Sequence, residues 1–81
     1  MTAAQLEAQA RKSIAARSTE QLCYDFGATE AQAGASREVA MVRGWLMDEL
    51  ETRDADAFDT WMFSDENLPH HFYGVAPAQL I

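Results

Sequence analysis

Apolar residues recur every three or four positions along most of the chain, which is the spacing of one face of an α-helix. The clearest run covers residues 37–53, and Ser36 precedes it as a residue that can cap the first helical turn. The apolar stripe of this run comprises Val39, Val42, Leu46 and Leu50. The pattern therefore predicts a central helix over residues 37–53.

This central helix is more apolar than a helix that buries one face only. Met41, Trp45 and Met47 widen the stripe until the apolar arc covers more than half of the circumference. A helix of this kind has to be covered on two sides. Because one small domain offers it only short neighbours, we expect the protein to form a homodimer.

A second helix is expected over residues 19–27. Ser18 and Gln21 have the spacing of a capping box, in which each side chain satisfies a backbone donor at the start of a helix. Leu22, Cys23 and Phe26 would face inward, and Gly27 would end the helix in a left-handed conformation.

A third helix is expected over residues 55–64, with Asp54 as its cap. Its connection to the central helix is very short, so the two helices should pack as neighbours. We therefore expect one shared core, formed by Trp45, Leu50, Phe58 and Trp61.

The two ends of the chain give weaker patterns. Residues 1–17 are rich in alanine and form a thin apolar stripe, which predicts an N-terminal helix that is held weakly. Residues 66–81 contain Pro69, Gly74 and Pro77 and are expected to form an extended tail. The fold class is thus an all-α compact bundle, with a helical core domain over residues 18–65.

Charge is distributed unevenly along the 81 residues, whose net charge is −7. Residues 1–43 hold five acids and five bases, whereas eight acids and only Arg53 follow Gly44. This acidic half would repel a phosphate backbone, so we expect no direct binding to nucleic acid. We expect it instead to face a protein partner, through Asp48, Glu51, Asp56 and Asp59, and Asp48 and Glu51 should project from the exposed side of the central helix. The alternative is that these acids only solubilise the protein.

Cysteine usage and hydropathy bear on the compartment. The single cysteine, Cys23, cannot form an internal disulfide, and no uncharged apolar run approaches the roughly 18 residues that a spanning helix needs. The pattern predicts a cytoplasmic protein without a signal peptide and without a membrane span.

Three residues could take part in chemistry: Cys23, His70 and His71. A cysteine nucleophile needs a nearby base, but Cys23 lies on an apolar helical face, where cysteine is usually a small buried hydrophobe. Adjacent histidines in an extended segment point to opposite sides and grip one metal ion poorly. We therefore assign no catalytic, cofactor-binding or metal-binding residue.

Small residues on the central helix suggest a close helix contact. Ala40 and Gly44 lie one turn apart, and together with Met41 and Trp45 they could form a self-association surface. The alternative is close packing against the first or second helix of the same chain. On the same helix, Arg43 falls beside apolar positions, so we expect it to be partly buried and paired with an acid such as Asp25.

The segment from Ser18 to Asp65 resembles small uncharacterised proteins of actinobacteria and their phages. The resemblance is strongest in the central run Val42-Arg43-Gly44-Trp45-Leu46-Met47-Asp48-Glu49-Leu50. It implies a relation to phages or other mobile elements, and it implies no activity.

These observations favour a non-catalytic, acidic protein that acts through protein interaction or regulation. Two alternatives stay open. The acids could imitate a nucleic-acid backbone and so inhibit a DNA- or RNA-binding enzyme, or the chain could be an enzyme that uses Cys23 or the two histidines.

Overall fold

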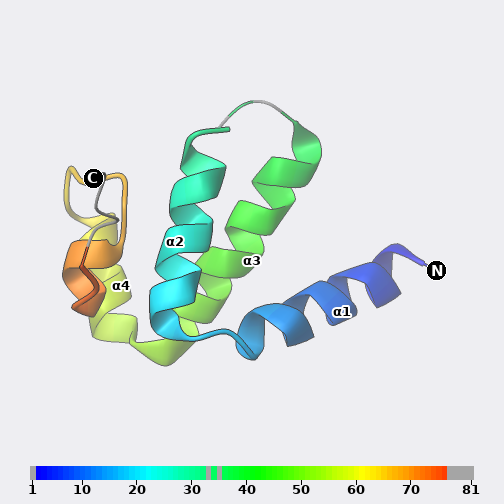
Figure 1. The fold of residues 1–81 in the computed structure, drawn as a ribbon, viewed down its shortest axis with the longest axis horizontal. Coiled ribbons are helices and arrows are strands. Elements are labelled where there is room, and N and C mark those ends of the chain that lie inside the picture. Colours follow the sequence, from blue (N-terminus) through cyan, green and yellow to red (C-terminus); the bar gives the residue numbers. More distant parts are fainter. Residues whose placement is uncertain (1, 33, 35, 77–81) are drawn as a thin grey trace.

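The computed structural model describes residues 2–32, 34 and 36–76, and these contain four α-helices and no strand. The helices are α1 (Ala3–Ala15), α2 (Thr19–Glu30), α3 (Arg37–Arg53) and α4 (Ala55–Met62), and a 3-10 helix, η1 (His70–Tyr73), follows. Helices α2 and α3 lie side by side, and α3 also contacts α1 and α4 (Figure 1). The all-α fold class predicted from the sequence is confirmed.

Local capping explains where the helices begin. The side-chain oxygens of Ser18, Ser36 and Asp54 accept hydrogen bonds from the backbone amides of Gln21, Val39 and Ala57, at 3.1, 3.1 and 3.0 Å. All three caps were expected. Asp54 also ends α3, because its backbone is extended, with φ −158° and ψ 94°, while its amide still donates the last helical hydrogen bond to the Leu50 carbonyl. Helix α1 begins with a further capping box, formed by Thr2 and Gln5.

Two helix ends differ from the prediction. Helix α2 continues past Gly27 to Glu30, because Gly27 does not adopt the positive φ that would end a helix. Contacts with α3 hold this last turn, where Glu30 and Thr29 both accept hydrogen bonds from Arg43. Helix α4 ends at Met62 rather than at residue 64, because Phe63 serves as its C-cap.

The hydrophobic core lies among α2, α3 and α4 and contains one residue of α1. Its buried members are Ile14, Leu22, Cys23, Phe26, Leu46, Leu50 and Trp61. Trp45 and Phe58 are partly buried and pack against them, which confirms the expected shared core. The predicted cover on two sides of the central helix is supplied within one chain, by α1, α2 and α4.

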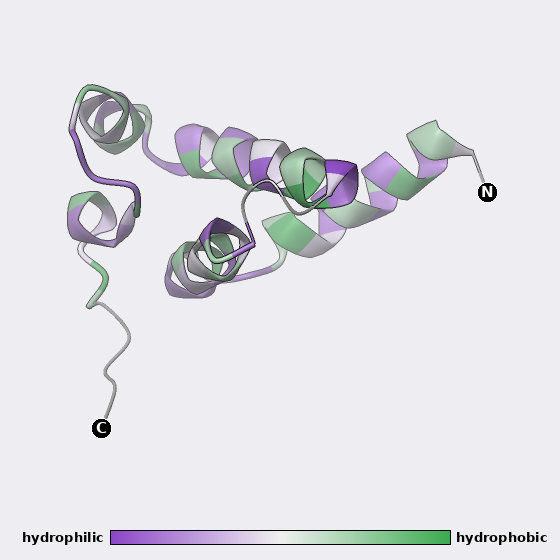
Figure 2. Cartoon of the chain, turned by 90° about the horizontal axis from the view of Figure 1, so that it is seen from above, coloured by the Kyte–Doolittle hydropathy of each residue, from purple (hydrophilic) through white to green (hydrophobic). Residues whose placement is uncertain are grey.

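Helix α1 projects away from the other helices, and neither view shows a neighbour beside its N-terminal half (Figures 1 and 2). Ile14 near its C-terminal end is buried, whereas Leu6 is exposed. Helix α1, for which a thin apolar stripe was predicted, therefore packs against the core at its C-terminal end only. Figure 2 also shows hydrophilic and hydrophobic positions alternating around the helices. Within the part of the chain that the structure describes, no helix is long and apolar enough to cross a membrane.

The prediction of an extended tail is wrong for residues 69–76. Pro69 and His70 are buried, η1 follows, and Phe72, Tyr73 and Val75 pack against the core. The Tyr73 hydroxyl donates a hydrogen bond to the Leu50 carbonyl at 2.8 Å. Proline prevents an α-helix here but is compatible with a short 3-10 turn, and burial of the aromatic residues favours folding back over extension. Residues 77–81 of the predicted tail lie outside the described residues.

Candidate functional site

The four acids proposed for partner binding are all exposed, but they belong to two helices. Asp48 and Glu51 project from the exposed side of α3, as expected, while Glu49 on the same helix is half-buried. Asp56 and Asp59 project from α4. The structure thus confirms the expected exposure of Asp48 and Glu51, and it shows that Asp56 and Asp59 are exposed as well.

Asp48 differs from the other three because it forms an ion pair. Its Oδ2 lies 3.0 Å from Arg11 Nη1 of α1. Sequence reasoning missed this contact because no local spacing brings residue 11 near residue 48. A substitution at Asp48 would disturb the docking of α1, so Asp48 is less suitable than Asp56 or Asp59 for testing recognition.

Ion pairing separates the acids into two groups. Among the described residues, five acids pair with arginine: Glu7, Asp25, Glu30, Asp48 and Glu49. The acids for which the structure shows no ion pair are Glu20, Glu38, Glu51, Asp54, Asp56, Asp59, Asp65 and Glu66. Six of these eight lie in residues 51–66, which we call the acidic segment. Asp54 is used as a helix cap, and the other five have no charged partner within the described part of the chain.

Two large apolar side chains are exposed within the acidic segment. Phe63 follows α4 directly and is 92% exposed, and Met62 before it is 43% exposed. No other large hydrophobic residue of the described ranges is as exposed as Phe63. Such a residue on a water-facing surface is a candidate anchor for a partner, particularly where acids flank it.

Arg43 is partly buried and paired, as predicted, but the predicted partner is wrong. Its Nη1 lies 2.9 Å from Glu30 Oε2, and its guanidinium lies over the Phe26 ring at 4.5 Å from the centroid. Asp25 pairs with Arg17 instead. Arg43 is therefore a structural residue that joins α3 to the end of α2.

The proposed self-association residues lie mostly in the open. Ala40, Met41 and Gly44 are exposed, whereas Trp45 is half-buried against the core. A Cβ atom placed on Gly44 would meet nothing within 4 Å. The alternative that Gly44 packs against the first or second helix of its own chain is therefore wrong. Self-association through this side of α3 stays a prediction.

The free space at Gly44 makes Gly44→Ala a stabilising substitution. Alanine in a helix interior is more favourable than glycine by about 1 kcal/mol, and the added methyl group has no neighbour to displace. The melting temperature should rise by about 4 to 8 °C. Thermal unfolding followed by circular dichroism measures this shift. A lower melting temperature would show that another surface approaches Gly44, and sedimentation of both proteins would test whether that surface is a second copy.

Cys23 does not meet the requirements of a nucleophile. Its side chain is fully buried in the core, and burial raises the pKa of the thiol to about 11. A thiol with this pKa stays protonated at neutral pH, and the thiolate is the reactive form. The structure supports the expectation of a buried, packing cysteine.

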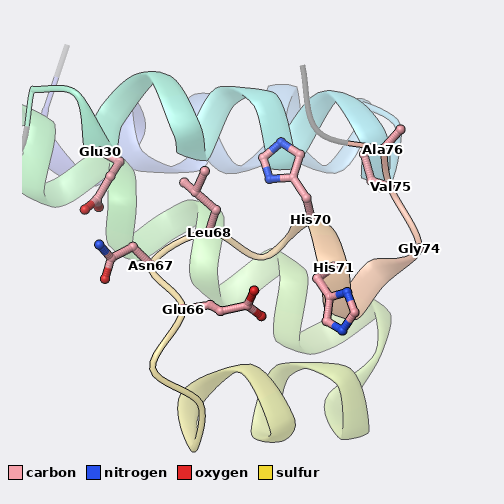
Figure 3. A pocket seen from close by; sticks show the side chains of 9 residues that line it. All are labelled: Glu30, Glu66, Asn67, Leu68, His70, His71, Gly74, Val75 and Ala76. Atoms are coloured by element: carbon pink, nitrogen blue, oxygen red, sulfur yellow. The ribbon is translucent and has the colours of Figure 1, made fainter. Parts of the chain in front are cut away.

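The two histidines diverge and line a pocket of about 930 Å³. Figure 3 shows the His70 side chain extending toward α2 and the His71 side chain extending away from it. Their divergence was expected, although it arises in η1 and not in an extended tail. The pocket lies between the end of α2, the loop after α4 and the segment that follows η1, and its lining includes Glu30, Glu66 and Leu68.

Aromatic residues fix the main chain that forms this pocket. Trp61 donates from Nε1 to the Glu66 carbonyl at 3.1 Å, and the Tyr24 hydroxyl donates to the Ala76 carbonyl at 3.0 Å. Gly74 ends η1 with a φ of 68°, a backbone conformation that glycine adopts most easily. The pocket walls are thus held at both ends by the folded core.

His70 is the buried polar residue of this pocket. It is 7% exposed, its ring lies 5.3 Å from the Tyr24 ring between centroids, and its Nδ1 atom is buried without a hydrogen-bond partner in the described structure. Burial lowers the pKa of His70 below its ordinary value of 6.5. The imidazole is therefore neutral at pH 7. Sequence reasoning placed His70 in a tail and missed its burial.

The lowered pKa of His70 predicts a loss of stability in weak acid. The unfolded chain takes up the proton near pH 6.5, before the folded chain does, so the free energy of unfolding should fall as the pH drops below about 6.5. Tyr24, Glu30, Glu66 and His71 are the other titratable groups near the ring or in the same pocket.

Urea unfolding between pH 7 and pH 5 measures this dependence. His70→Phe should flatten the decline, whereas the exposed His71→Phe should leave it unchanged. Equal slopes for the wild type and His70→Phe would contradict the prediction.

Among the described residues, no group of three or more His, Cys, Asp or Glu side chains is arranged to hold a metal ion. A scan against protein-family models and searches of curated proteins and of solved structures found no match for this chain. The function therefore has to be inferred from the arrangement of its own residues.

Proposed function

We propose that the protein is a non-catalytic interaction or regulatory protein, and that its acidic segment binds a basic surface of a partner protein. The proposal rests on one observation: six of the eight acids that lack an ion pair in the described structure lie in residues 51–66. Unpaired surface charge attracts a partner of opposite charge and sets the rate and specificity of association.

The exposed apolar residues of the acidic segment can act as anchors for the partner. Phe63 and Met62 offer apolar area in the same segment as Asp59 and Asp65. Interfaces commonly combine an aromatic anchor with a polar rim. The partner that fits is a protein with an apolar pocket bordered by lysine or arginine.

The proposal predicts that charge reversal in α4 strongly reduces partner capture. Asp56→Lys with Asp59→Lys changes the local charge by four units without removing an ion pair, so capture of the partner from host extract at low salt should fall at least about tenfold. Phe63→Ala should weaken it further, because an anchor residue contributes more than about 1 kcal/mol.

A matched control separates recognition from helix stability. Glu20 and Glu38 are exposed acids in the first turns of α2 and α3, where acids favour the positive end of the helix. Glu20→Lys with Glu38→Lys makes the same change in net charge and should leave capture intact. If both double variants lose the partner equally, net charge and not the acidic segment is responsible.

An inhibitor that imitates a nucleic-acid backbone is a special case of a protein that binds a basic surface. The carboxylates without an ion pair support this inhibitor as well as they support any other acidic binding protein. In that case the captured partner would be a DNA- or RNA-binding enzyme, and nucleic acid would compete for it. The enzyme alternative has weaker support, because the Cys23 thiol is buried and protonated. Retained function after Cys23→Ser with His70→Ala and His71→Ala would remove that alternative.

A further inference from the structure

The pocket beside η1 combines an apolar wall with carboxylates. Leu68, Val75 and Ala76 supply apolar surface, and Glu30 and Glu66 reach the pocket from α2 and from the loop after α4 (Figure 3). Its volume of about 930 Å³ lies in the range of small-molecule sites. This combination suits a small ligand with an apolar body.

The buried imidazole of His70 points to a ligand with hydrogen-bond donors. A buried polar atom without a partner costs about 1–3 kcal/mol, and such atoms are exceptional in native proteins. His70 Nδ1 is one of them, and its residue lines the pocket. A neutral imidazole can accept a hydrogen bond at Nδ1 when the proton is on the other nitrogen.

The charges around the pocket select a cation. The described lining contains no lysine or arginine, Glu66 has no ion pair in the described structure, and the whole chain has a net charge of −7. An anionic ligand such as a phosphate would be repelled, whereas an ammonium group would be attracted.

We propose that this pocket binds a small organic amine whose aromatic ring packs against Leu68 and Val75, whose ammonium group faces Glu66, and one of whose N–H groups donates to Nδ1 of His70. Nδ1 of His70 is closed off in the structure, so the amine reaches it when Leu68 rotates aside. Cδ2 of Leu68 and Cε1 of His70 both lie 3.9 Å from the position that a Cβ atom on Gly27 would take, and Leu68 is 39% exposed, so its side chain has room to turn toward solvent.

Titration of the ¹⁵N-labelled full chain with tryptamine tests the proposal. Tryptamine should shift the backbone amides of residues 66–76 and of the end of α2, together with the ring nitrogens of His70. Indole-3-acetate has a similar ring and the opposite charge, and it should bind at least about tenfold more weakly because of the surrounding acids. Indole-3-ethanol, the neutral analogue, should fall between the two.

Two substitutions locate the binding groups. Glu66→Gln should weaken tryptamine binding about two- to fivefold, the range of an exposed ion pair, and should leave indole-3-ethanol unaffected. Glu51→Gln removes an equal charge outside the pocket lining and is the matched control. His70→Phe keeps an aromatic ring but removes the acceptor, so it should weaken tryptamine binding while the fold, checked by the amide spectrum, is retained.

Several results would overturn the proposal. These are the absence of shifts in residues 66–76 at millimolar tryptamine, equal affinity for indole-3-acetate, or equal effects of Glu66→Gln and Glu51→Gln. The outcome is independent of the proposed function, because partner capture is tested through Asp56, Asp59 and Phe63, none of which lines the pocket.

Discussion

Replacing Trp61 with alanine should destabilise the protein by about 3–5 kcal/mol, the usual effect of removing a large buried aromatic residue. Trp61 is 3% exposed and meets Phe26 and Phe58 edge to face, with ring centroids 5.0 and 5.8 Å apart. Its indole N–H also donates to the Glu66 carbonyl, so the variant loses a hydrogen bond as well as packing.

This loss is a large part of the total stability expected of the chain. Small domains are stable by about 0.05–0.15 kcal/mol per residue, which is about 4–12 kcal/mol for 81 residues, so Trp61→Ala should unfold at a much lower urea concentration than the wild type. Urea unfolding followed by far-UV circular dichroism measures the change. Trp45→Ala is the matched control, because Trp45 is half-buried and should cost less than about 2 kcal/mol. Equal losses would show that Trp61 is not the centre of the core.

Ending the chain after Leu68 should reduce the free energy of unfolding by at least about 3 kcal/mol, because it removes the apolar area that Phe72, Tyr73 and Val75 bury. The shortened chain would expose part of the core and leave the Leu50 carbonyl without the Tyr73 hydroxyl. An extended tail without packing would give no such loss.

Tyr73→Phe provides the graded comparison for this truncation. It removes only the hydrogen bond to Leu50 and should cost about 1 kcal/mol. Burial raises the pKa of Tyr73 to about 12, with further contributions from Asp54, Cys23 and Glu51, so the hydroxyl is protonated and able to donate at neutral pH. If truncation after Leu68 leaves the free energy of unfolding unchanged, residues 69–76 do not stabilise the protein by packing against the core.

Local interactions allowed the sequence alone to determine the helices and several of their features. Ser18, Ser36 and Asp54 cap helices because their side chains reach backbone amides only three residues away, whatever the tertiary structure is. The exposure of Asp48 and Glu51 and the burial of Cys23 also followed from the helical period. The sequence alone also determined the excess of negative charge in the residues after Gly44.

Only the tertiary structure decided the features that depend on how helices pack. Arg11 meets Asp48, and Arg43 meets Glu30 in place of Asp25, because the rotation and crossing of neighbouring helices set which side chains come within reach. Helix α2 continues past Gly27 because packing against α3 outweighs a local preference of about 1 kcal/mol. The burial of His70 and the pocket beside it depend on a segment that folds back onto residues far away in the chain, and no periodic pattern encodes such a contact.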